Sequence, residues 1–105
     1  MKHTERITVR SHQPPVIEID PTCAAAYVRF KKGKVAKTKE ITERKAPVTC
    51  TVDFDAKGEV IGIELIGVKE FTIQRIVEML PEGARHFDFQ RARFVPAFSP
   101  ELTEA

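Results

Sequence analysis

Residues 48–66, with the sequence VTCTVDFDAKGEVIGIELI, carry the strongest structural signal in the chain. Apolar and polar side chains alternate through VTCTVDF (48–54), the period of two that is typical of a strand with one buried face. Asp55 to Gly58 have the composition of a short hairpin loop. The apolar run EVIGIELI (59–66) follows as the return strand, so the stretch predicts two neighbouring antiparallel strands.

Three further strands are predicted upstream of this hairpin. Residues 16–20 (VIEID) and 24–30 (AAAYVRF) flank a turn at Asp20-Pro21-Thr22. Their alternation places Val28 and Phe30 on one face of the sheet and Tyr27 on the other. Residues 35–41 (VAKTKEI) predict a polar strand, whose lysines suit a solvated face or a protected sheet edge. The short connections favour antiparallel pairing, because parallel strands need long crossovers.

Downstream of the hairpin, the apolar period changes to that of a helix. The spacing i, i+3, i+4, i+7 is found in Ile73, Ile76, Val77 and Leu80. Thr72 is the expected N-cap, and Pro81 ends the segment. A helix of about nine residues is too short to be stable alone, so we expect it to dock on the sheet.

The predicted fold class is therefore α+β, an antiparallel β-meander sheet of four to six strands with one short α-helix packed on one face. A length of 105 residues suits one domain. We expect residues 1–15 to form an N-terminal arm and residues 16–80 to form the domain. Residues 81–105 are the C-terminal extension, in which residues 86–89 alternate as an extra strand would before a flexible tail.

Composition indicates an ordinary globular protein, 42% hydrophobic and 30% charged, with a net charge of +2. No apolar run approaches the roughly 20 residues that cross a bilayer. The first residues, MKHTERITVRSH, contain no apolar run typical of a secretory signal. Cys23 and Cys50 are too few for a disulfide framework. We therefore expect a cytoplasmic protein without membrane contact.

A family resemblance rests on IEIDPTCAAAYVRF (17–30), GKVAKTKEI (33–41) and VTCTVDFDAKGEVIGIELIG (48–67). The order and spacing of eight residues carry it: Asp20, Tyr27, Asp53, Asp55, Gly58, Gly62, Ile63 and Glu64. In these the chain resembles the small prokaryotic family catalogued as domain of unknown function 2283, over about residues 17–67. The family usually has Asp where this chain has Ala24, and Leu where it has Ala26.

The resemblance implies a small antiparallel sheet with a helix packed on it. It implies no established activity and supplies no catalytic residue. Some members of the family resemble antitoxin partners of small ribonuclease-type toxins. The resemblance therefore favours an interaction protein.

The sequence contains no catalytic signature, and we expect no enzyme activity. There is no nucleophile motif to pair with a base and no glycine-rich phosphate loop. Four carboxylates near the hairpin loop could bind a hard cation, namely Asp53, Asp55, Glu59 and Glu64. Turn formation and solvation explain the same residues, and no ligand spacing of His or Cys supports a metal. We expect no catalytic, cofactor or metal site.

Two segments are candidates for partner contact. The first is aromatic and basic, with partner-binding candidates Phe87, Phe89, Arg91, Arg93 and Phe94. It could bind a protein or stack on RNA, or it could pack on the chain's own sheet. The second is residues 29–45, which hold eight basic and two acidic side chains. Its nucleic-acid-binding candidates are Arg29, Lys31, Lys32, Lys34, Lys37 and Lys39, and the alternative is a solvated edge.

Together these patterns predict a non-enzymatic protein-interaction module, such as the antitoxin-like partner of a small toxin. The alternative is a nucleic-acid-binding module that uses the basic 29–45 region. We also expect a homodimer, because one helix cannot cover both faces of so apolar a sheet.

Overall fold

The computed structural model describes residues 9, 13–41, 49–85, 87 and 89–96. Most of the predicted N-terminal arm and the predicted flexible tail after residue 96 lie outside these residues. The strands are β1 (Val16–Asp20), β2 (Ala25–Arg29), β3 (Lys37–Ile41), β4 (Thr49–Phe54), β5 (Val60–Ile66) and β6 (Arg93–Pro96). The helices are α1 (Ile73–Met79) and the 3-10 turns η1 (Pro21–Cys23), η2 (Glu82–Ala84) and η3 (Phe89–Arg91).

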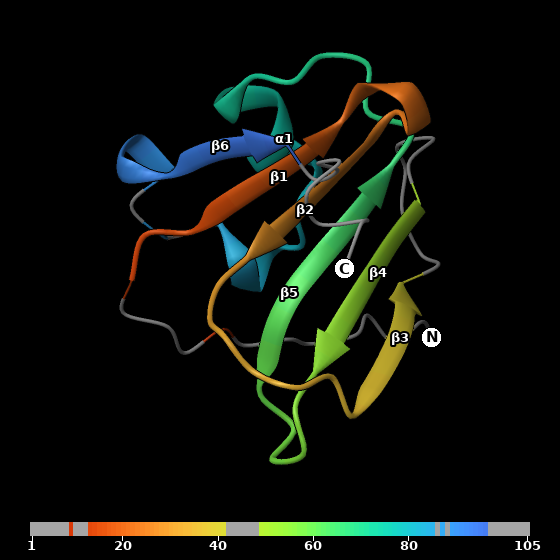
Figure 1. Cartoon of the computed structure of the whole chain (residues 1–105), viewed down its shortest axis with the longest axis vertical. Helices are drawn as coiled ribbons and strands as arrows, with labels where there is room; N and C mark the ends of the chain where they lie inside the picture. The colour runs from red at the N-terminus through yellow and green to blue at the C-terminus, as the bar shows by residue number, and fades with distance from the viewer. Residues whose placement is uncertain (1–8, 10–12, 42–48, 86, 88, 97–105) are drawn as a thin grey trace.

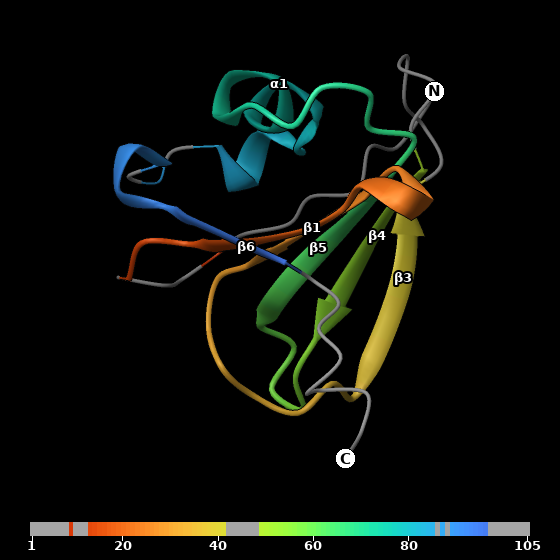
Figure 2. The ribbon, with the colours of Figure 1, turned by 45° about the horizontal axis from the view of Figure 1, so that its top comes forward.

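All six strands belong to one sheet in the order β3-β4-β5-β2-β1-β6, and α1 packs on one side of it (Figures 1 and 2). The predicted α+β class, with a mostly antiparallel sheet and one short helix, is confirmed. In the described part of the chain α1 has seven residues, and no helix there reaches the length and apolarity of a membrane span.

The predicted hairpin is present as β4 and β5. These strands run antiparallel, with Cys50 opposite Leu65 and Val52 opposite Ile63. The Asp55 backbone N–H donates to the Glu59 carbonyl at 2.8 Å and closes the loop. Gly58 adopts a positive φ of 83°, which only glycine enters without strain.

The strand order differs from that of a simple meander, because β2 pairs with β5 rather than with β3. The backbone N–H groups of Phe30 and Lys31 both donate to the Ile61 carbonyl as the chain crosses the end of β5. Burial explains this order. All but two residues of β5 are buried, whereas four of the five residues of β3 are exposed. The apolar strand takes the centre of the sheet, and the polar strand takes the edge.

The core lies between the sheet and α1. Ile76 and Leu80 are fully buried against sheet residues such as Val28 and Ile63. Burial of each large aliphatic side chain contributes about 1.5–3 kcal/mol before entropy is counted. The predicted N-cap is confirmed, since the Arg75 backbone N–H donates to the Thr72 hydroxyl at 3.2 Å.

The C-terminal segment adds the last strand. β6 pairs in parallel with β1, so that Ile17 lies opposite Phe94. The structure places a strand of the C-terminal extension at residues 93–96, and of residues 86–89, where alternation indicates a strand, it describes only Phe87 and Phe89. Phe89 instead begins η3 and is buried in the core.

The residue after η1 has an unusual backbone conformation. Ala24 has φ 53° and ψ 42°, the left-handed region that side chains with a Cβ disfavour. The neighbouring Ala25 lies in β2 with extended backbone.

These two alanines make a matched test of backbone strain. We expect Ala24→Gly to raise the free energy of unfolding by about 0.5–1 kcal/mol, because glycine relieves the left-handed strain. Ala24→Val should lower it by about 1–3 kcal/mol, while Ala25→Val should change it little. Urea denaturation measures the free energy of unfolding of all three variants. Equal values for the two valine variants would contradict the assignment of left-handed strain to Ala24.

Candidate functional site

The sheet face opposite α1 is the candidate site, and we call it the open face. Its side chains alternate with the core residues and form three rows across the strands. The first row is Glu40, Thr51, Glu64, Tyr27, Glu18 and Val95, the second is Thr38, Asp53, Gly62, Arg29, Val16 and Arg93, and the third is Thr49, Ile66, Ala25 and Asp20. Within the described residues, α1, η2 and η3 all pack on the other side (Figure 2).

A hydrogen-bonded trio joins β2, β4 and β3 at the centre of the open face. The Tyr27 hydroxyl donates to Asp53 Oδ2 at 2.8 Å, and the Thr38 hydroxyl donates to Asp53 Oδ1 at 2.7 Å. Burial of the half-buried ring raises the pKa of Tyr27, and the nearby Asp53 carboxylate raises it further. Tyr27 therefore stays protonated and acts as a hydrogen-bond donor rather than as a base.

Gly62 makes this trio possible. It lies on β5, between Tyr27 on β2 and Asp53 on β4, and the tyrosine ring must cross it. A Cβ atom at residue 62 would collide with the Cε2, Cζ and Oη atoms of Tyr27. Glycine within a central strand commonly marks such a close approach.

Charged groups flank the trio. Arg29 Nε donates to Glu18 Oε2 at 2.9 Å, and the guanidinium carbon lies 5.0 Å from the centre of the Tyr27 ring. These contacts hold the arginine over the ring. Glu64 and Glu40, in contrast, make no hydrogen bond or ion pair with any residue described.

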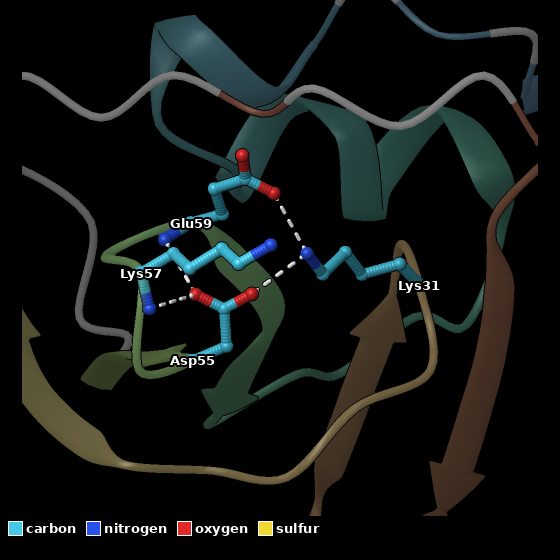
Figure 3. Close-up of polar contacts among 4 residues, drawn as sticks. All are labelled: Lys31, Asp55, Lys57 and Glu59. Atoms are coloured by element: carbon cyan, nitrogen blue, oxygen red, sulfur yellow. Dashed lines mark hydrogen bonds and ion pairs between the residues drawn. The ribbon is translucent and has the colours of Figure 1, made fainter.

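A second polar cluster ties the end of β2 to the hairpin loop (Figure 3). The Lys31 ammonium pairs with both Asp55 Oδ2 and Glu59 Oε1 at 2.7 Å. Asp55 Oδ1 also accepts hydrogen bonds from the backbone N–H groups of Lys57 and Glu59, both at 2.9 Å. An ammonium ion thus lies between the carboxylates that sequence analysis weighed as metal ligands.

The four carboxylates near the hairpin do not converge. Asp53 and Glu64 belong to the open face, whereas Asp55 and Glu59 bind Lys31. Across the residues that the structure describes, no group of three His, Cys, Asp or Glu side chains could hold a metal ion.

The predicted partner-binding residues of the C-terminal segment are divided between core and surface. Phe89 is buried, and the half-buried Phe87 ring lies 5.1 Å from Phe30, centre to centre. Phe94, Arg91 and Arg93 are exposed. These five side chains therefore do not form one continuous patch.

The predicted nucleic-acid-binding residues are also divided. Arg29 and Lys31 are held in the ion pairs described above. Lys32 and Lys34 are exposed in the connection between β2 and β3. Lys37 and Lys39 lie opposite Phe54 and Val52, which places them on the helix-covered side of the edge strand.

Sequence analysis missed the roles of Gly62, Thr38 and Glu18. Alternation assigns these residues to a face, but their contacts depend on strand register. A glycine inside the most apolar strand was the one local signal, because it suggests that another group passes over the backbone.

Comparison with known proteins relates the chain to a family. A family model described as a protein of unknown function (DUF2283) matches residues 17–69. The matched part contains Tyr27, Asp53, Gly62 and Glu64. No curated protein and no solved structure matches the chain.

The packing of Tyr27 over Gly62 predicts a coupled pair of substitutions. Gly62→Ala should lower the free energy of unfolding by about 1–3 kcal/mol, because the new methyl group displaces the ring from Asp53. In a Tyr27→Ala background, Gly62→Ala should lower the free energy of unfolding only slightly. Gly33→Ala is the control, since its Cβ would meet the Ile61 side chain at an ordinary 3.4 Å. Urea denaturation of all variants measures the coupling. An equal loss of free energy of unfolding in the wild-type and Tyr27→Ala backgrounds would refute the coupling.

The Lys31 cluster predicts a response to acid. The Lys31 ammonium, helped by the Glu59 backbone N–H, lowers the pKa of Asp55 from 3.8 to about 2. As the pH falls, Asp55 is therefore protonated in the unfolded chain before it is protonated in the folded chain. The ionised carboxylate thus stabilises the fold above about pH 4, and this stabilisation is lost as the pH falls to about 2. Asp55→Asn should lower the Tm at pH 7. The difference in Tm between wild type and variant should become smaller as the pH falls from about 4 to about 2. Thermal unfolding followed by circular dichroism tests this, and a constant gap would contradict it.

Proposed function

The chain belongs to DUF2283, a family of proteins of unknown function, and we propose a function for it. We propose that it is a non-enzymatic protein-interaction module that binds its partner through the open face. The observation that carries the proposal is the arrangement of the sheet. The described helices pack on one face, while the other presents an ordered polar surface beside an exposed apolar residue.

The chemistry of the open face favours binding over catalysis. Asp53 accepts hydrogen bonds at both carboxylate oxygens, and the raised pKa of Tyr27 keeps its proton in place. Arg29 is held by Glu18 and the Tyr27 ring. A catalytic acid or base needs a titrating group near its working pH, whereas a binding surface needs fixed donors and acceptors.

Ile66 supplies an apolar contact at one end of the open face. The residue is 41% exposed, and it lies opposite Ala25 on β2 and Thr49 on β4. Protein interfaces commonly combine apolar contacts with polar ones. Ile66 supplies the first kind on this face, and Tyr27 supplies the second.

The finer proposal concerns the kind of partner. The family resemblance supports a small toxin as the bound protein, with this chain as its antitoxin-like neutralising partner. The exposed Phe94, Arg91 and Arg93 on and beside the β6 edge would then extend the contact beyond the open face. A second copy of the chain is a further proposed partner for the same face.

Binding of nucleic acid is the second candidate function. It is favoured by Lys32, Lys34 and Lys37, which are exposed and make no ion pair within the described part of the chain. Phosphate groups could pair with these side chains in a salt-dependent manner.

Co-expression with the product of the neighbouring gene, followed by pull-down, tests the main proposal. Wild-type protein should retain that product at micromolar concentration, and Ile66→Arg should weaken retention by about tenfold, as expected when a charge replaces an apolar interface residue. Val35→Arg is the matched control, because Val35 is similarly exposed but lies in the connection before β3.

Failure of the wild-type protein to retain the product would remove the toxin proposal, and equal loss in both arginine variants would remove the open face as its site. Retention of DNA or RNA at low salt, abolished by a triple Lys32, Lys34 and Lys37 to Ala variant, would establish the second candidate instead.

A further inference from the structure

We infer that the partner surface bound by the open face is cationic, with arginine or lysine side chains that pair with Glu64 and Glu40. The inference rests on the proposed function and specifies the chemistry of the partner. It follows from the charge, the pairing and the spacing of the side chains on this face.

The open face differs in charge from the rest of the molecule. The chain as a whole carries a net charge of +2. On this face, acidic side chains outnumber basic ones five to two among the described residues. The acidic set is Glu18, Asp20, Glu40, Asp53 and Glu64, and the basic set is Arg29 and Arg93. A face with this balance is complementary to a positively charged surface.

The pairing within the face shows which carboxylates are available. Asp53 accepts hydrogen bonds from Tyr27 and Thr38, and Glu18 forms an ion pair with Arg29. Glu64 is half-buried in the central strand, and Glu40 is exposed on the edge strand. Neither has a partner within the described residues, so these two can accept cations without breaking an existing contact.

The spacing of these two residues is regular. Glu40 lies opposite Thr51, and Thr51 lies opposite Glu64, so the glutamates are two strands apart in one row. Neighbouring strands are about 4.8 Å apart, which places their backbones about 10 Å apart. Residues i and i+7 of an α-helix lie on one side at about 10.5 Å. A helix with basic residues seven apart, laid across the strands, would match both glutamates.

Charge also argues against the other occupants of this face. In a symmetric dimer the same patch meets itself, so a largely acidic surface would face its own copy. Nucleic acid would bring phosphates against the same carboxylates. A cationic protein surface is the occupant that charge complementarity favours.

Two helical peptides of identical composition test the inference. Each is a 20-residue Ala/Gln peptide with three arginines, spaced seven residues apart in one and five apart in the other. At 3.6 residues per turn, a spacing of seven keeps the arginines on one side, whereas a spacing of five spreads them around the helix. Fluorescence anisotropy at low salt should show tighter binding of the first peptide.

Variants locate the contact. Glu64→Gln and Glu40→Gln should each weaken binding by roughly threefold to fivefold, the upper range for an accessible ion pair. Glu70→Gln is the control, because Glu70 is exposed beside Arg75, before α1 on the other side of the sheet. It removes the same charge and should change binding little.

The outcomes separate this inference from the proposed function. Equal affinity for both peptides, equal weakening by Glu70→Gln, or no binding at all would overturn the cationic partner. If the wild-type protein still retains the neighbouring gene product and Ile66→Arg weakens this retention, the proposed function holds although the inference of a cationic partner fails. A dimer seen by sedimentation equilibrium and dissociated by Ile66→Arg would assign the face to a second copy and overturn the inference.

Discussion

The structure depends on the burial of β5. This strand is the most apolar in the chain, and only a position with a strand on each side and the helix layer above removes its side chains from water. Once β5 is central, β4 takes one side through the hairpin and β2 takes the other. The polar β3 is left at the edge, and the chain must cross the end of β5 to reach it.

The open face is organised by a second constraint, the absence of a side chain at Gly62. The missing side chain lets the Tyr27 ring cross the central strand and reach Asp53, which in turn accepts a hydrogen bond from Thr38 on the edge strand. Three strands are thus joined by side chains as well as by backbone. A surface fixed in this way loses little conformational entropy when a partner binds, which favours recognition.

Local pattern was sufficient for much of the fold. The alternation around Cys50 and Val52, the loop ending at Gly58 and the helix cap at Thr72 were all predictable, because each depends on neighbours within a few residues. Strand order was not predictable in the same way, since it depends on competition between strands for the buried centre. The contacts of the open face could not be predicted for a related reason. Tyr27 and Asp53 come together only when the register of the strands is known. The phenylalanines of the C-terminal segment, taken as surface candidates, show the same limit, because the position of Phe89 depends on a core that composition does not describe.

The parallel pairing of β1 with β6 has a kinetic consequence. β1 is among the first strands to leave the ribosome, and β6 is the last of the six. The hairpin and the β1–β2 pair can form while synthesis continues, but the β1 edge stays unpaired until residues 93–96 emerge. Among the strand pairs that the structure describes, this pairing closes the longest loop, a step expected to be slow. During translation, the nascent chain exposes a β1 edge that the finished protein conceals.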